Sequence, residues 1–97
     1  MILSIIIPVY NEEPTVRKLI ETVIETPLPV DREIIVVDDC STDGSRTILE
    51  QLTTKEITVL YHDVNRGKGA AIRTGLEAVS GDIFVVQDAD LEYDPND

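Results

Sequence analysis

The stretch EIIVVDDCSTDGS (residues 33–45) indicates the fold class, because an apolar run in it is followed directly by residues that begin a helix. Residues 33–37 are nearly continuous in Ile and Val, which is typical of a strand buried on both faces of a sheet. Ser41, Thr42 and Asp43 are candidate N-caps for a helix that continues to Leu52. The segment therefore predicts a strand, a loop and a helix in succession.

Three further apolar runs, at residues 2–9, 57–61 and 83–86, repeat this pattern on either side. Residues 14–25 have helical apolar spacing, and we expect Glu13 to complement the dipole of that helix. A third helix is predicted between the last two runs, with Ile72, Leu76 and Val79 on one face, Gly75 allowing close packing and Gly81 ending it. The order predicts an α/β fold, a three-layer Rossmann-like domain of four mostly parallel strands and three crossover helices.

Length and composition limit the classes of protein that the chain can represent. Its 97 residues suffice for one core, and 42% apolar residues are enough to pack it. A net charge of −11 argues against nucleic-acid binding. No apolar stretch reaches the ~20 residues that span a bilayer, so we expect no transmembrane segment. A single cysteine, Cys40, and the lack of a secretory signal favour a cytoplasmic protein.

The segments after the strands hold the candidate ligand-binding residues, since ligands of such sheets bind at the carboxyl ends of the strands. Tyr10 can flank a nucleobase. Glu12 can accept a hydrogen bond from a ribose hydroxyl or a base amine, and the alternative is that it complements the dipole of the following helix, as Glu13 is expected to do. Asp38 and Asp39 allow two interpretations. Either one braces the loop while the other faces a nucleoside, or both cap the following helix.

The sequence NRGKGAA (residues 65–71) has features of an anion site. Gly67 and Gly69 permit close approach of the backbone, and Arg66 and Lys68 add positive charge at a predicted helix N-terminus. It matches neither the dinucleotide fingerprint nor the Walker loop. A diphosphate suits this place, and the alternative is a flexible turn with solvated cations.

Asp88 and Asp90 form a D-x-D motif after the last apolar run, and Glu92 continues the alternation. Their oxygens suit Mg²⁺ or Mn²⁺ better than Zn²⁺. The alternative is a solvated acidic loop, while an EF-hand fails because Tyr93 stands where Gly is required. His62 and Cys40 lack spaced partners, so we interpret both as loop packing; no general base can be identified.

Taken together, SIIIPVYNEE, EIIVVDDCSTDGS, NRGKGAAIRTGL and GDIFVVQDADLEYDP resemble family 2 glycosyltransferases of the GT-A fold. They look most like transferases that move mannose or glucose onto dolichyl or polyprenyl phosphate. The resemblance covers nearly the whole chain and implies that residues 1–97 are the N-terminal part that binds the nucleotide sugar, without the acceptor-binding half. It implies that the nucleoside is surrounded by Pro8, Tyr10, Glu12, Val37 and Asp39, and that Lys68 contacts the diphosphate. It also implies that the sugar-nucleotide site is lined by Asp88, Ala89 and Asp90. The divalent cation would be held by Asp88, Asp90 and Glu92.

The resemblance also implies the reaction. A sugar would pass with inversion from a nucleoside-diphosphate sugar, of the GDP-mannose or UDP-glucose type, to an acceptor such as a polyprenyl phosphate at the cytoplasmic face of a membrane. The cofactor would be Mg²⁺ or Mn²⁺. Because the acceptor-binding half is missing, residues 1–97 need not be active alone. The alternative is a non-catalytic nucleotide-binding or interaction module, and a haloacid-dehalogenase-like phosphatase ranks below both. We also expect an uncovered sheet edge to favour a homo-oligomer.

Overall fold

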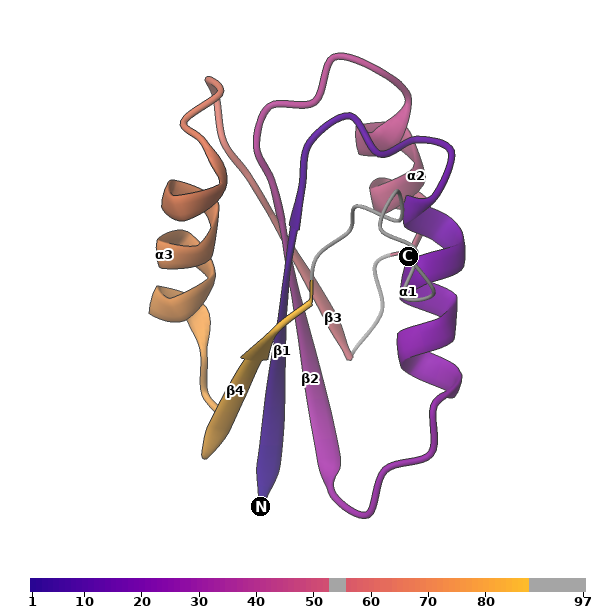
Figure 1. The fold of residues 1–97 in the computed structure, drawn as a ribbon, viewed down its shortest axis with the longest axis vertical. Coiled ribbons are helices and arrows are strands. Elements are labelled where there is room, and N and C mark those ends of the chain that lie inside the picture. Colours follow the sequence, from indigo (N-terminus) through magenta and orange to yellow (C-terminus); the bar gives the residue numbers. More distant parts are fainter. Residues whose placement is uncertain (53–55, 88–97) are drawn as a thin grey trace, which may run out of the picture.

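The computed structural model describes residues 1–52 and 56–87, which form a parallel four-stranded sheet with three helices (Figure 1). The strands lie in the order β3-β2-β1-β4, and every pair of neighbours is parallel. This confirms the predicted α/β class and the alternation of strands and helices. In chain order the elements are β1 (Ile2–Val9), α1 (Val16–Glu25), β2 (Asp31–Asp38), α2 (Ser45–Leu52), β3 (Ile57–Tyr61), α3 (Lys68–Ala78) and β4 (Ile83–Val86).

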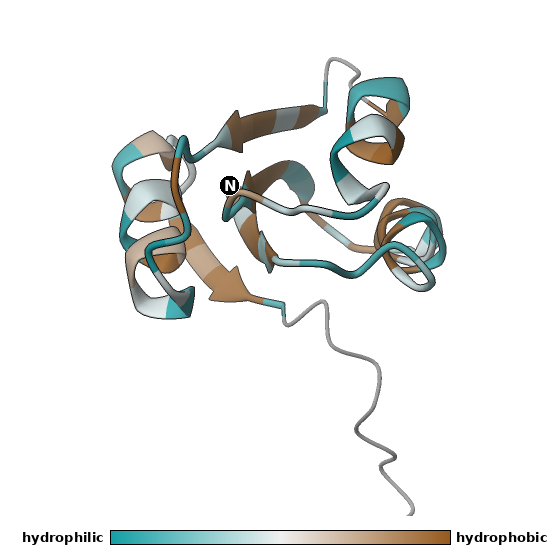
Figure 2. Cartoon of the chain, turned by 90° about the horizontal axis from the view of Figure 1, so that it is seen from above, coloured by the Kyte–Doolittle hydropathy of each residue, from teal (hydrophilic) through white to brown (hydrophobic). Residues whose placement is uncertain are grey.

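Helices cover both faces of the central strands, with α1 and α2 on one side and α3 on the other (Figure 1). Successive strand residues point to opposite faces, so alternate residues enter different cores. Ile34 and Val36 of β2 pack in the core with α1 and α2, whereas Ile35 and Val37 pack with Ala71 of α3. Seen from above, brown apolar strands lie between the helices (Figure 2). Burial on both faces explains why these runs are continuous instead of alternating.

Helix α3 contacts the sheet chiefly through small residues, Gly75 among them as expected, and of the expected stripe Val79 packs against the core beneath the helix. Its buried positions are Ala71 and Gly75, while Leu76 is 38% exposed. A Cβ on Gly75 would lie 2.6 Å from Cγ2 of Ile6, so only glycine lets the helix come this close. The expectation for Gly81 is also wrong, because the helix ends at Ala78 with the extended residue Val79 as its cap.

Of the two outer strands, β4 departs furthest from two-sided burial. Its four residues Ile83, Phe84, Val85 and Val86 are 40–49% exposed. The apolar run predicted a covered strand, but in residues 1–52 and 56–87 only β1 pairs with it. The expectation of a homo-oligomer stays a prediction, and this strand is the surface that supports it. Among the described helices, none is both long enough and apolar enough to cross a bilayer.

Candidate functional site

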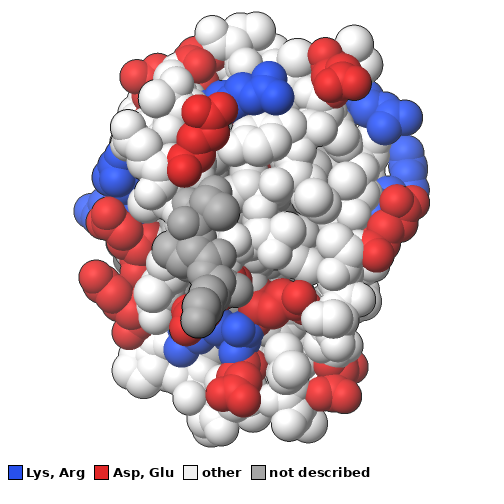
Figure 3. All heavy atoms as spheres, turned by 180° about the vertical axis from the view of Figure 1, so that it is seen from behind, with Lys and Arg blue, Asp and Glu red and all other residues white. Residues whose placement is uncertain are grey.

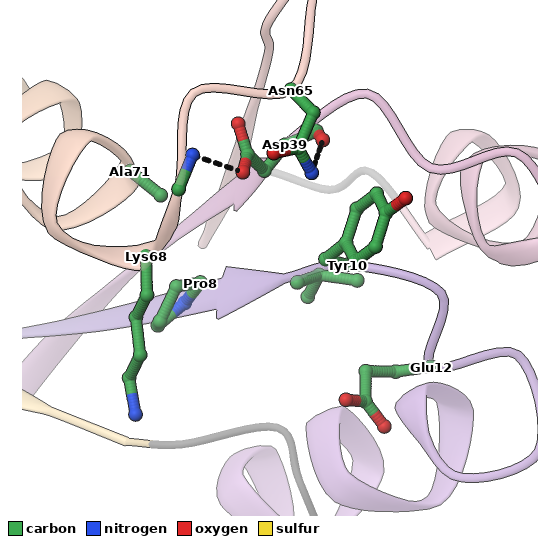
Figure 4. A pocket seen from close by; sticks show the side chains of 9 residues that line it. Pro8, Tyr10, Glu12, Asp39, Asn65, Lys68 and Ala71 are labelled. Carbon is green, nitrogen blue, oxygen red and sulfur yellow. Dashed lines mark hydrogen bonds between the residues drawn. The ribbon is translucent and has the colours of Figure 1, made fainter.

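A cavity of about 440 Å³ opens at the carboxyl ends of β1 and β2, beside the start of α3 (Figure 4). Its volume lies within the usual range of small-molecule sites. Six residues singled out in the sequence, Gly67 of the predicted anion site among them, meet in its wall, although they come from segments far apart in the chain. The residues that line the cavity are Pro8, Val9, Tyr10, Glu12, Asp39, Asn65, Gly67, Lys68 and Ala71.

The side chains of the cavity combine an aromatic ring with charges of both signs. Tyr10, 44% exposed, lies in Figure 4 between Glu12 and the pair formed by Asp39 and Asn65. The carboxylate of Glu12 accepts a hydrogen bond from the Thr15 hydroxyl at 3.3 Å. Lys68 is the first residue of α3, so its ammonium group adds to the positive end of the helix dipole. A flat apolar group and an anion could both be held here.

Asp39 has the most constrained carboxylate of the cavity. It is 3% exposed, and its Oδ1 accepts from Nδ1 of His62 at 2.8 Å and from the Arg66 amide at 2.9 Å. Its Oδ2 accepts from the Gly67 amide at 2.8 Å. Burial by itself would raise the pKa of this carboxyl, but these hydrogen bonds, that of His62 foremost, lower it below the ordinary value. Asp39 is therefore a fixed anion at neutral pH.

Its neighbour Asp38 has the other role that the sequence allowed. It is fully buried, and it accepts hydrogen bonds from the Ser41 amide at 3.2 Å and the Ser41 hydroxyl at 2.5 Å. Asp38 thus braces its own loop while Asp39 lines the cavity. Of the three candidate caps of α2, Asp43 bonds the amide of Ser45 at 2.9 Å.

The loops after β1 and β2 are joined by polar contacts that the sequence did not predict. Oδ1 of Asn11 accepts from the amides of Thr42 at 2.7 Å and Asp43 at 3.3 Å. Glu13 accepts from the Gly44 amide at 2.6 Å, so it serves the start of α2 and not α1 as expected. Asn11 has a φ of 51°, a conformation that Asn tolerates better than most residues. The two loops therefore form one wall beside the cavity.

The sequence did not predict the places of three further residues. Asn65 lines the cavity, and its Nδ2 donates to the carbonyl oxygen of Asp39 at 3.4 Å. His62, interpreted as loop packing, is 6% exposed and bonded to Asp39. Val37, expected around the nucleoside, is fully buried in the core beneath α3 and does not line the cavity.

The expected metal ligands Asp88, Asp90 and Glu92, together with Ala89, lie outside the described residues. Within residues 1–52 and 56–87, no three His, Cys, Asp or Glu side chains are grouped so as to hold a metal ion. The motif follows Gln87, whose amide donates to the Ile6 carbonyl oxygen of β1 at 2.8 Å. Elsewhere, acidic side chains are spread over both the upper and the lower part of the face in Figure 3.

An open parallel sheet with a mixed polar and aromatic cavity at its carboxyl edge defines a ligand-binding α/β domain. The sequence pattern described as Glycosyl transferase family 2 matches residues 4–97, and the chain belongs to this family of enzymes. Its fold matches that of GT-A glycosyltransferases of known structure. The family predicted from the motifs is thus confirmed.

The proteins similar to this chain include curated relatives and proteins of known structure. A dolichol-phosphate mannosyltransferase of Pyrococcus furiosus is 35% identical over 98% of this chain and 27% of its own length. The crystal structure of S. aureus TarS 1-349 in complex with UDP has a TM-score of 0.84 at 31% identity, over 93% of this chain and 28% of that one. The mannosyltransferase PcManGT from Pyrobaculum calidifontis, in complex with GDP-Man and Mn²⁺, has a TM-score of 0.79 at 34% identity, over 91% and 27% respectively. The chain spans less than a third of each relative.

Proposed function

We propose that residues 1–97 are the donor-binding part of a metal-dependent glycosyltransferase. Its substrate is a nucleoside-diphosphate sugar of the GDP-mannose or UDP-glucose type. The observation that carries the proposal is one cavity that unites Tyr10, Glu12 and Asp39 with Lys68 at the N-terminus of α3. The neighbours solved with UDP and with GDP-Man support the same ligand class.

The base, the ribose and the diphosphate of the donor each have a matching group in the cavity. The Tyr10 ring offers a face to the base, and the carboxylates of Glu12 and Asp39 accept from base N–H groups or ribose hydroxyls. Asp39 already accepts three hydrogen bonds, so about one lone pair is left for the ligand. Lys68 and the start of α3 favour the diphosphate, on which negative charge grows as the glycosidic bond breaks.

The metal is part of the proposal because of the donors that follow β4 in the sequence. Asp88, Asp90 and Glu92 offer only carboxylate oxygens, which fit Mg²⁺ or Mn²⁺. When bound, such an ion neutralises charge on the leaving diphosphate. The neighbour solved with Mn²⁺ supports this assignment.

We propose a polyprenyl phosphate as the acceptor, by analogy with the dolichol-phosphate relative. The phosphate of such a lipid is already ionised near neutral pH, so inverting displacement needs little help from a general base. This fits the absence of an identifiable base among the motifs of the sequence. A lipid acceptor would also bring the reaction to the cytoplasmic face of a membrane.

Calorimetric titration of the 97-residue chain with UDP, GDP and their sugars, with and without Mn²⁺, tests the proposal. We expect saturable binding that Lys68→Ala weakens about tenfold or more, as loss of a charged contact does. Lys18→Ala on α1 removes the same charge away from the cavity and should leave the affinity unchanged. A folded chain that binds none of these nucleotides would contradict the proposal.

A further inference from the structure

His62, the one histidine of the sequence, is buried and has both ring nitrogens engaged. It follows β3, and its backbone amide extends the ladder by donating to the Asp38 carbonyl oxygen at 2.9 Å. Its Nδ1 lies 2.8 Å from Oδ1 of Asp39, and its Nε2 lies 2.8 Å from Oγ1 of Thr74 on α3. The ring therefore connects the end of β3 to the end of β2 and to α3.

The hydrogen positions on the Asp39 side of the ring follow from chemistry. Asp39 is held ionised and can only accept, so Nδ1 of His62 carries the proton of their bond. The Thr74 hydroxyl also lies 3.0 Å from the Ala70 carbonyl oxygen, within the same helix. Thr74 thus fixes the far side of the ring to α3, whose first residue lines the cavity.

His62 does not line the cavity, yet it contacts a residue that does. If its ring were removed, Oδ1 of Asp39 would keep only the bond from the Arg66 amide. The carboxylate could then rotate, and the backbone at residues 66–67, which both Asp39 oxygens bind, would lose its fixed anchor. Both groups belong to the wall where the nucleotide is proposed to bind.

We propose that His62 is a positioning residue that holds the Asp39 carboxylate and the backbone of Arg66 and Gly67 in the geometry that binds the nucleotide. This inference rests on the proposed function. The group that matters is the Nδ1–H donor, and its action reaches the ligand only through Asp39. Loss of His62 should therefore lower nucleotide affinity even in a chain that stays folded.

Two substitutions distinguish the contribution of Nδ1 of His62 from that of Nε2. The amide nitrogen of Asn is as many bonds from Cα as Nδ1 of His, whereas that of Gln matches Nε2. We expect His62→Asn to bind UDP or GDP within about threefold of the unchanged chain. His62→Gln and His62→Ala should bind the nucleotide roughly tenfold or more weakly, because each variant loses the charge-assisted hydrogen bond to Asp39. Affinities are measured by calorimetry below the thermal midpoint of each variant.

Amide chemical shifts and hydrogen exchange of Arg66 and Gly67, measured without nucleotide, give a second readout. Both should change in His62→Gln and remain near those of the unchanged chain in His62→Asn. Equal affinities in the Asn and Gln variants, or unaltered Arg66 and Gly67 amides in the Gln variant, would overturn the inference. If the unchanged chain binds no nucleotide, the proposed function fails, and the amide signals still decide whether His62 positions this wall.

Discussion

At the scale of single residues, Asn11 does two things that different substitutions separate. It adopts a positive φ, and its side chain bonds the loop after β2. Asn11→Gly keeps the conformation and loses the bonds, which should cost about 0.5–1.5 kcal/mol. Asn11→Ala also places an ordinary side chain in the left-handed region, for a total of about 1–3 kcal/mol. Urea unfolding measures both, and equal losses would contradict this account.

Whether the sequence could predict a site residue depends on how far apart in the chain that residue and its contacts lie. Tyr10, Glu12 and Lys68 were found because each stands after a strand, and the parallel topology brings such positions to one edge. The partners of His62 lie 23 and 12 residues away, at Asp39 and Thr74, and no spacing rule connects them. Val37 was misplaced because a strand residue next to a cavity can point either into it or into the core.

At the scale of elements, the two glycines of α3 predict opposite effects. Gly75→Ala should destabilise the chain by about 1–3 kcal/mol, because the new methyl group meets Ile6 across the contact with β1. Gly69→Ala in the first turn of the same helix meets nothing within 4 Å. It should stabilise by about 0.5–1 kcal/mol, since Ala favours a helix more than Gly does. Thermal unfolding measures the stability of both variants. A Gly75→Ala chain that is more stable than the unchanged one would refute the close contact between Gly75 and Ile6.

The close packing at Gly75 was predicted from the sequence and is confirmed, whereas other properties of the elements were not predicted. The bounds of β1, β3 and β4 follow from their apolar runs, and β2 extends its run at both ends, to Asp31 and Asp38. The face of α3 does not follow from hydrophobicity, because closeness to the sheet selected small residues over Leu76. The exposure of β4 depends on which strand pairs with it, and an apolar run carries no information about that.

At the scale of the whole molecule, Glu33 fastens the amino end of the sheet. Its carboxylate accepts from the Ser4 hydroxyl of β1 at 2.5 Å and from the amide of Ser80, before β4, at 3.0 Å. Burial by itself would raise the pKa of Glu33, but the hydrogen bonds, that of the Ser4 side chain first, lower it below its ordinary value of 4.5. Its stabilising effect is therefore complete well above pH 4.5 and is lost as the pH falls through the lower folded-state pKa.

Glu33→Gln should consequently reduce the free energy of unfolding at pH 7, and the difference from the unchanged chain should shrink as the pH falls below 4.5. Glu21→Gln, on the exposed side of α1, removes the same charge without these partners and serves as the matched control. Urea unfolding at pH 7, 5 and 3.5 measures the differences. A gap for Glu33→Gln that stays constant over this range would contradict the assignment.

The central place of β1 also has a consequence for the order of folding. β1 pairs with β2, which ends at residue 38, and with β4, which begins at residue 83. During synthesis, β1 and β2 can pair as soon as both are made. The other side of β1 stays unpaired until β4 is synthesised about forty-five residues later. Closing so long a loop is slow. We therefore expect a ribosome-bound chain to populate an intermediate in which the side of β1 that faces β4 is still open.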